Sequence, residues 1–354
     1  MRGDENMSVK KPFRIGISPD FATQATGMLD PGIDEVLKLA PGVEWEHMPD
    51  TSGVAVPEIL NRYDAAIVLD YRFPAESFRG LERLAIIARW GVGYDRIDVP
   101  ACTEASVILA VTTDSVRRPV SEGALGLIFA LAKNFRAHDR NCRAGRWREQ
   151  APVGFNIAGK TLGVVGLGNI GRELFRLARG VGFHRLMAYV PSAPNAEETA
   201  AGVEYTDLDT VMRESDFISI HCPLNEQTRG MIGACQLALM KPTAYLINTA
   251  RGPIVDEQAL IAALREHKIA GAGLDVFETE PIPAGHALLE LDNAILAPHV
   301  IARTRECIRD TSLSACRSVV AVSQGSTPPY IVNRKVLDSP GMKEKLARHR
   351  PQNI

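Results

Sequence analysis

The sequence predicts an α/β protein built from two doubly wound parallel-sheet domains, with the second inserted into the first. Short β-rich apolar runs alternate with helical patterns along most of the 354 residues. This length is enough for two domains with separate cores. Two longer helical patterns bracket the central series of strands. Apolar strands separated by helices are typical of a parallel sheet covered by helices on both faces.

The first series of strands begins close to the N-terminus. The runs that we expect to form strands are Phe13–Ile17, Val43–Glu46 and Ala65–Leu69. Residues 1–11 before them are charged and polar, and we expect a short disordered lead-in there. The sequence contains no long apolar segment that would act as a signal or a membrane span.

A glycine turn follows the first series near the middle of the chain. Residues 164–171 read VVGLGNIG, so that Gly166, Gly168 and Gly171 form G-x-G-x-x-G, with Asn169 and Ile170 between the last two. A β-rich run at 160–165 precedes the turn, and a helical pattern at 172–179 follows it until Gly180 and Gly182. In this context the glycines permit a tight turn, the approach of a pyrophosphate and close packing of helix on strand. The segment predicts a dinucleotide site at a helix N-terminus.

The residue that would read the adenosine ribose departs from this pattern. An Asp or Glu usually ends the second strand about 20 residues after the glycines. Here the second strand is Arg185–Val190, and Val190 stands at the expected carboxylate position. Without a carboxylate, repulsion of a 2′-phosphate is lost, but no Lys or Arg follows to bind that phosphate and Ser192 offers one hydrogen bond. The residues therefore leave the cofactor preference open: we expect NAD, with NADP as the alternative because Val190 replaces the usual acidic residue.

A second series of strands and two long helices complete the organisation. The later strands are expected at Asp216–His221, Ala244–Asn248, Ala272–Val276 and Ala294–Ala297, with a helix at Glu257–Lys268. The long helical patterns are Ser121–Arg143 and Arg303–Ser323. We therefore expect residues 119–304 to form a nucleotide-binding domain inserted into a substrate domain of residues 1–118 and 305–354. From Gly325 the chain is rich in proline and charge, and we expect its end to be mobile.

Three polar residues stand at or just beyond the ends of successive strands in the second series. Arg251, Glu280 and His299 would lie at the carboxyl edge of the sheet, where ligands bind in open α/β folds. A His suits proton transfer to or from a secondary alcohol, and a carboxylate on its second ring nitrogen would fix its tautomer. An Arg would bind a substrate carboxylate or carbonyl oxygen. Singly, each has a structural explanation as a surface, turn or strand-end residue, but together they predict hydride-transfer chemistry.

Composition excludes several other classes of protein. Hydrophobic residues make up 45% of the chain, charged residues 23%, and the net charge is −2, which does not favour nucleic acid or another polyanion as partner. Basic clusters at 143–148 and 343–350 are expected to be solvated. Six cysteines without a C-x-x-C pair or metal-ligand spacing indicate reduced thiols in a cytoplasmic protein and no metal site.

Five segments together resemble the D-isomer-specific 2-hydroxyacid dehydrogenases. They are Arg89–Asp98, Val165–Gly171, Asn248–Gly252, Gly273–Pro281 and Ala297–Val300. The resemblance covers roughly residues 60–325 and implies a Rossmann nucleotide domain inserted into a flavodoxin-like substrate domain. It implies Arg251, Glu280 and His299 as the catalytic triad, and backbone N–H groups of Val92 and Gly93 as ligands for a substrate carboxylate. It also implies a homodimer and cofactor contacts at Ile170, Arg172, Cys222, Pro223, Thr249, Ala250, Arg251 and Asp275.

Some residues depart from the family pattern, and two alternative functions stay open. Gly123 stands where many relatives have His, and residues 300–303 replace a turn of small residues after His299. Arg72, Arg117 and Arg118 are candidates for an anionic substrate, although we expect salt bridges for all three. The main alternative is a nucleotide-sensing, corepressor-like binding protein. A formate-type dehydrogenase would carry Gln at the position of Glu280.

Overall fold

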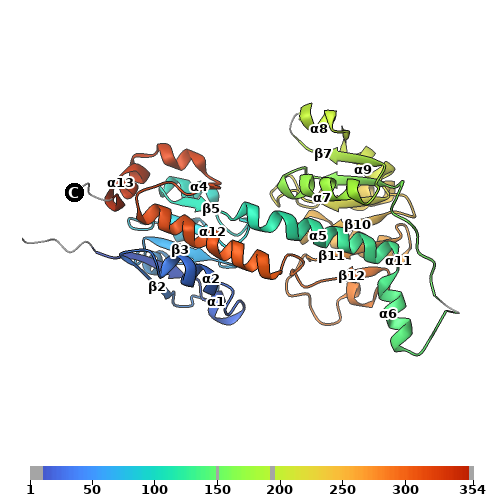
Figure 1. Cartoon of the computed structure of the whole chain (residues 1–354), viewed down its shortest axis with the longest axis horizontal. Helices are drawn as coiled ribbons and strands as arrows, with labels where there is room; N and C mark the ends of the chain where they lie inside the picture. Colours follow the sequence, from blue (N-terminus) through green and yellow to red (C-terminus); the bar gives the residue numbers. More distant parts are fainter. Residues whose placement is uncertain (1–10, 149–150, 192–195, 351–354) are drawn as a thin grey trace, which may run out of the picture. The chain divides into compact units, whose positions relative to one another are not determined.

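The computed structural model describes residues 11–148, 151–191 and 196–350 and divides the chain into two compact units (Figure 1). The first unit consists of Met1–Val116 and Thr304–Ile354, and the second of Arg117–Arg303. Most of the expected lead-in, the residues after 350 and Ser192 lie outside the described residues. Within the described residues, no helix combines the length and the apolar character needed to cross a membrane.

The first unit is built on a five-stranded parallel sheet. Its strands are β1 (Phe13–Ile17), β2 (Val43–His47), β3 (Ala65–Val68), β4 (Ile86–Arg89) and β5 (Ile108–Ala110), in the order β2-β1-β3-β4-β5. Its helices are α1 (Asp20–Thr23), α2 (Asp30–Gly32), α3 (Pro57–Leu60), α4 (Val99–Glu104), α12 (Arg305–Ser323) and α13 (Pro340–His349). Helix α12 packs across β3 and β4, so that the C-terminal part of the chain completes the core of the N-terminal part.

The second unit is built on a seven-stranded parallel sheet. Its strands are β6 (Thr161–Val165), β7 (Arg185–Tyr189), β8 (Val203–Tyr205), β9 (Phe217–Ile220), β10 (Tyr245–Asn248), β11 (Gly271–Leu274) and β12 (Ala294–Leu296), in the order β12-β11-β10-β9-β6-β7-β8. Its helices are α6 (Phe135–Arg143), α7 (Asn169–Gly180), α8 (Ala196–Ala200), α9 (Leu208–Glu214), α10 (Ala234–Leu239), α11 (Glu257–Arg265) and most of α5 (Thr113–Ala132). The predicted class of two parallel-sheet domains is confirmed.

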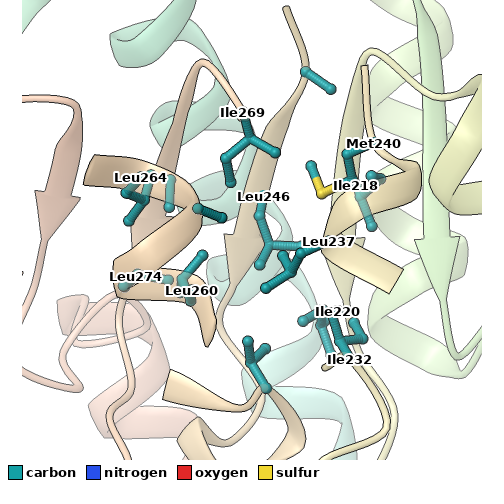
Figure 2. Packing of buried hydrophobic residues seen from close by; sticks show 14 of the residues in the cluster. Ile218, Ile220, Ile232, Leu237, Met240, Leu246, Leu260, Leu264, Ile269 and Leu274 are labelled. Carbon is teal, nitrogen blue, oxygen red and sulfur yellow. The ribbon is translucent and has the colours of Figure 1, made fainter. Parts of the chain in front are cut away.

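Helices cover both faces of the second sheet and bury most residues of its central strands. On one face, α10 and α11 pack against β9 and β10, and Figure 2 shows Leu237 and Leu260 near Leu246 of β10. On the other face, α5 and α7 pack on β6 and β7 around Leu162, Val164 and other buried residues. The strand order reverses between β6 and β9, and in this class of sheet ligands bind at the carboxyl ends of the strands where the order reverses.

The long helix expected at 121–143 is wrong, because the structure has two helices there. Helix α5 begins earlier, at Thr113, and ends at Ala132, and α6 begins at Phe135. Asn134 between them adopts a left-handed conformation with φ 52°. Asn is among the few residues with a Cβ that adopt this conformation readily, because its side chain can hydrogen-bond locally.

The closing stretch is also more ordered than its composition suggests. Helix α13 follows Ser339, whose hydroxyl accepts a hydrogen bond from Met342 N at 3.2 Å as an N-cap. Met342 and Leu346 are buried in the core of the first unit. Lys345, within the basic cluster that we expected to be solvated, is 5% exposed. An apolar i, i+4 pair on α13 therefore anchors this segment to the first unit.

Candidate active site

The glycine turn connects β6 to α7 as the sequence predicts. Gly166 has φ 94°, and a methyl group there would lie 2.5 Å from the backbone N of Cys222. Gly168 caps α7, and a methyl group on it would meet no atom within 4 Å. A methyl group on Gly171 would lie 2.8 Å from the carbonyl O of Gly166. Gly166 and Gly171 are thus required by close packing inside the protein, whereas Gly168 borders open space in front of a helix N-terminus, next to Asn169.

Polar atoms without partners lie in the loops that follow β9 and β10. Thr249 Oγ1 and His221 Nδ1 are buried, and neither has a hydrogen-bond partner in the described part of the chain. Thr249 and Ala250 follow β10, and Cys222 and Pro223 follow β9, so all four lie at the carboxyl edge of the sheet. Burial raises the pKa of the Cys222 thiol to about 11, which keeps it neutral. The open space at Gly168 and these buried donors and acceptors fit a dinucleotide lying across the strand ends.

An ion pair lies close to the end of β7, where the sequence predicts the residue that would contact the adenosine ribose. Val190 directly follows β7 and is partly buried beside the cluster under α7. Arg172, in the first turn of α7, forms an ion pair with Glu198 of α8, and Glu198 also accepts a hydrogen bond from the Tyr205 hydroxyl. Tyr205 pairs in register with Ala188, two residues before Val190. The Arg172 guanidinium therefore meets a carboxylate near the end of β7.

His299 and Glu280 are in direct contact. His299 Nδ1 lies 2.8 Å from Glu280 Oε2, and Glu280 Oε1 accepts a hydrogen bond from Phe277 N at 3.0 Å. Burial alone would raise the pKa of Glu280. The hydrogen bond and charge of His299, the Phe277 N–H and the charge of Arg251 together lower this pKa below its ordinary value. The carboxylate therefore stays ionised, and the imidazole keeps Nε2 available for a substrate.

Asp275 holds the turn that carries His299. His299 has φ 55°, and its N–H donates to the Asp275 carbonyl O at 2.8 Å. The Asp275 carboxylate accepts hydrogen bonds from Val300 N at 2.9 Å and Ile301 N at 3.2 Å. Burial raises the pKa of Asp275, and the two backbone N–H groups oppose that rise. Asp275, which we expected near the nicotinamide, thus holds the main chain from His299 to Ile301.

Arg251 is placed by its neighbour Asn248 at the end of β10. The Asn248 side-chain amide donates to the Arg251 carbonyl O at 2.9 Å, and its Oδ1 accepts from Ala250 N at 3.1 Å. Arg251 Nη1 donates to the Ala250 carbonyl O at 2.7 Å. The charge of Arg251 is one of the causes that lower the pKa of Glu280. The structure thus brings the three polar residues singled out in the sequence to one edge of this sheet.

The candidate carboxylate-binding residues, Val92 and Gly93, belong to the first unit. They follow β4 in a turn in which Gly91 has φ 125° and donates its N–H to Thr112 Oγ1 at 2.8 Å. The guanidinium of Arg89 covers Gly91, because a methyl group on Gly91 would lie 1.6 Å from Arg89 Nη1. The Arg89 guanidinium also donates a hydrogen bond to the Trp90 carbonyl O, so it lies against the start of the turn that contains Val92 and Gly93.

Two residues of the site were missed as functional candidates from the sequence. Arg89 is the first residue of Arg89–Asp98, one of the segments that carry the family resemblance, and its place in that segment could have identified it as a candidate. His221 ends a predicted strand immediately before Cys222, and burial lowers its pKa to about 4, so that it is neutral. Its Nε2 lies 2.8 Å from Ser219 Oγ, which leaves Nδ1 for a ligand.

The three additional arginines belong to different units of the chain. Arg118 pairs with Glu122 and with Glu173, the latter at 3.1 Å, which agrees with the salt bridge expected for it. The Glu173 pKa is lowered to about 2 by hydrogen bonds from Arg176 and Arg118. Arg72 and Arg117 are exposed on the first and second units respectively.

Comparison with known proteins points to one family. Residues 125–300 match the family described as D-isomer specific 2-hydroxyacid dehydrogenase, NAD binding domain. The chain is 38% identical over 298 residues to a glyoxylate reductase of Korarchaeum cryptofilum, covering 83% of this chain and 90% of that protein. A crystal structure of a glyoxylate reductase from Paecilomyes thermophila matches with a TM-score of 0.78 and 28% identity, covering 92% of this chain and 99% of that one. An acyclic imino acid reductase in complex with NADPH and D-Arg matches with a TM-score of 0.77 and 26% identity, covering 90% of this chain and 99% of that one.

Proposed function

The chain belongs to the D-isomer-specific 2-hydroxyacid dehydrogenase family and is an NAD(P)-dependent oxidoreductase, and we propose that it reduces a small 2-oxoacid with His299 as the proton donor. The observation that carries this proposal is the 2.8 Å contact between His299 Nδ1 and Glu280 Oε2. With Nδ1 held by a carboxylate that stays ionised, the imidazolium is stabilised and Nε2 is left to deliver a proton.

The other residues bind the substrate in an orientation that suits this transfer. When bound, the dinucleotide supplies a hydride to C2 of the 2-oxoacid. His299 Nε2 gives its proton to the carbonyl oxygen as that oxygen gains the electron pair of the C=O bond. In the second unit, Arg251 would polarise the carbonyl group of the substrate. In the first unit, the N–H groups of Val92 and Gly93 are our candidates for donors to its carboxylate. Glyoxylate is the first substrate to test, because relatives with this name are similar over most of the chain.

The dinucleotide would be held by the glycine turn and by the loops after β9 and β10. Asn169, Ile170 and Gly171 would present backbone N–H groups to the pyrophosphate at the N-terminus of α7. Cys222 and Pro223 would border the adenosine side, and Thr249, Ala250 and Asp275 the nicotinamide side. The buried Thr249 Oγ1 supports this assignment, because it would gain a hydrogen-bond partner from the ligand.

We propose NAD as the preferred cofactor. Glu198 balances the charge of Arg172 near the end of β7, and a 2′-phosphate there would be repelled by the same carboxylate. Glu198→Gln should therefore raise the ratio of kcat/KM for NADPH to that for NADH above the wild-type ratio. Val190→Asp should lower this ratio below the wild-type ratio. If Val190→Asp leaves the affinity for both cofactors unchanged, Val190 does not face the ribose.

A panel of 2-oxoacids with NADH or NADPH tests the reaction. His299→Ala should lower kcat by about 10²–10⁴-fold, the usual value of a positioned general acid, while NADH affinity is retained. His184→Ala is the matched control, because His184 is an exposed histidine of the same unit. Bound nucleotide without turnover of any 2-oxoacid would instead support the nucleotide-sensing binding protein.

We also propose that the protein is a homodimer that associates through the second unit. Three large hydrophobic side chains on and after α6 face solvent, with exposures of 58% for Phe135, 68% for Trp147 and 94% for Val153. Large apolar side chains that face solvent are candidates for a protein–protein interface. Light scattering should give twice the 38.5 kDa of one chain, and Trp147→Ser should weaken the dimer.

A further inference from the structure

Gly123 lies against Ile301 in the structure, and both belong to segments that depart from the family pattern. A methyl group on Gly123 would lie 2.2 Å from Ile301 Cγ1 and 3.2 Å from both Ile301 Cβ and the Ile301 carbonyl O. Gly123 belongs to α5, and Ile301 follows His299 by two residues. The side chain of Ile301 thus occupies the space that any side chain at position 123 would need.

Asp275, which directly follows β11, also holds the turn that contains Ile301. The Asp275 carboxylate accepts hydrogen bonds from Val300 N and Ile301 N, and the Asp275 carbonyl accepts one from His299 N. Ile301 itself packs against the hydrophobic cluster beneath α5. The three residues 299–301 are therefore fixed between the end of β11 on one side and α5 on the other.

Local backbone preference does not hold His299 in place. Its φ of 55° costs a residue with a Cβ free energy, so the conformation must be imposed by neighbouring contacts. Ile301 is β-branched and stiff, and its Cγ1 and Cβ, rather than a flexible end, face Gly123. A rotation of the Ile301 side chain would move Cγ1 but would leave Cβ and the carbonyl O 3.2 Å from the added group, so the turn itself must also shift by a few tenths of an ångström.

We propose that Gly123 and Ile301 are a matched pair of positioning residues, in which the missing side chain on α5 lets Ile301 set the orientation of His299. The proposal rests on the proposed function, because the orientation matters only if His299 donates the proton. A displacement of the turn would break the 2.8 Å contact with Glu280 and misplace the imidazole against the substrate. A misplacement of about 1 Å can cost roughly 10²-fold in rate.

Gly123→Ala and Gly126→Ala form the matched test. Both replace a glycine of α5 by the best helix former, but a methyl group on Gly126 would meet no atom within 4 Å. We expect Gly123→Ala to lower kcat for the 2-oxoacid by at least about 10-fold with KM within about 3-fold. Gly126→Ala should leave both constants unchanged. Equal kinetics for the two variants would overturn the proposal.

Rescue by a second substitution separates positioning from general damage. In Gly123→Ala/Ile301→Ala the new methyl group takes the space vacated by Ile301, and we expect kcat to recover most of the loss. A double variant as slow as Gly123→Ala would contradict the matched pair. Should Gly123→Ala not fold, Ile301→Gly decides the question: the proposal predicts a loss of kcat, and wild-type kinetics would overturn it.

A measurement without cofactor or substrate completes the test. In histidine-labelled protein, the imidazole NMR signal of His299, assigned by its loss in His299→Gln, should shift in Gly123→Ala and return in the double variant. An unchanged signal in Gly123→Ala would contradict the proposal. If wild-type protein reduces no 2-oxoacid, the proposed function fails; if it does and Gly123→Ala behaves like Gly126→Ala, this inference alone fails.

Discussion

His299 shows how much of the site depends on main-chain contacts around one residue. The imidazole is partly exposed, and its conformation with φ 55° costs of order 1–3 kcal/mol. The hydrogen bonds to Asp275 and the contact with Glu280 offset that cost. A catalytic base or acid held in this way is already oriented before the substrate binds, which reduces the entropy lost in the transition state.

Glu280→Gln tests the electrostatic part of this arrangement. The pKa of Glu280 is lowered in the folded protein, so its negative charge persists across the pH range in which imidazoles titrate. Removing the charge removes a group that favours the imidazolium. We expect the alkaline limb of the pH profile for 2-oxoacid reduction to move to lower pH, and kcat at pH 7 to fall by roughly 10–100-fold. Profiles of kcat/KM between pH 5 and 9 measure this.

The control is Glu278→Gln, an exposed carboxylate two residues away. An unchanged alkaline limb in Glu280→Gln would mean that this carboxylate does not stabilise the protonated form. The lowered pKa of Glu280 also determines how stability depends on pH. A carboxyl group whose pKa is lower in the folded than in the unfolded state stabilises the protein at pH values above its unfolded-state pKa. This contribution is lost as the pH falls through the folded-state pKa. Glu280→Gln should therefore flatten the acid side of the stability curve.

At the level of single residues, the sequence predicted the polar residues of the candidate site better than the contacts that hold them in place. Arg251, Glu280 and His299 each follow a strand, and parallel strands bring their carboxyl ends to one edge, so their proximity could be expected. The Asp275 hydrogen bonds and the fit of Ile301 against Gly123 could not, because they depend on side-chain packing between segments far apart in the chain. His221 has no pattern of its own; only its burial without a partner for Nδ1 singles it out.

At the level of elements, the β6–turn–α7 unit makes distinct demands on its glycines. Gly166 needs a positive φ and has no room for a Cβ next to Cys222, whereas Gly168 has φ −85° and ψ −163° and open space around it. The first glycine is therefore needed for the fold and the second for the ligand. A single motif thus combines a structural and a binding requirement within three residues.

Gly166→Ala and Gly168→Ala should separate these requirements. We expect Gly166→Ala to lower the free energy of unfolding by roughly 2–4 kcal/mol through overpacking and the strained φ. Gly168→Ala should change it by less than about 1 kcal/mol but weaken NADH binding at least about 10-fold, because the methyl group intrudes where the pyrophosphate approaches. Urea unfolding and NADH fluorescence titration measure both. Tight NADH binding by Gly168→Ala would place the pyrophosphate elsewhere.

The C-terminal helix α13 is fixed by a buried charge. Lys345 Nζ donates to three carbonyl oxygens, of Leu84 at 2.8 Å, Ala105 at 2.9 Å and Ser106 at 3.1 Å. Lys345→Met would leave these acceptors without the ammonium, and we expect a loss of about 1.5–3 kcal/mol in the free energy of unfolding. Lys343→Met is the control, because Lys343 is exposed on the same helix. Equal stabilities of the two variants would show that the three hydrogen bonds contribute nothing net.

Element boundaries were predictable where hydrophobic periodicity was strong and were missed where local conformation decided them. The strand before the glycine turn and helix α12 lie within two residues of their predicted limits. The strands β4, β5 and β8, of three or four residues each, are not among the strands that we expected, although β9, β10, β11 and β12 are equally short and were expected. Helix α13 was not predicted, because its sequence is rich in charge. The burial of Lys345 depends on carbonyl groups about 240 residues earlier in the chain, which the local sequence does not reveal.

At the level of the whole molecule, each unit has its own hydrophobic cores. Two clusters of buried residues lie within the first unit, and two others lie within the second. The candidate cofactor contacts and Arg251, Glu280 and His299 all belong to the second unit, whereas Val92 and Gly93 belong to the first. The proposed cofactor contacts thus all belong to a part of the chain that has its own cores.

A polypeptide of residues 113–303 should therefore fold and bind NADH without reducing 2-oxoacids. It retains the whole of α5 and the complete seven-stranded sheet, so its core is preserved. It lacks the Val92 and Gly93 N–H groups and Arg89, so a 2-oxoacid would lose most of its carboxylate ligands. We expect NADH affinity within about 10-fold of the full chain, and kcat/KM lower by at least about 10³-fold, because substrate positioning is worth several kcal/mol. Circular dichroism, NADH titration and a turnover assay measure the three properties. A folded fragment with full activity would show that the first unit does not bind the substrate, and a folded fragment that does not bind NADH would show that the first unit contributes to the cofactor site.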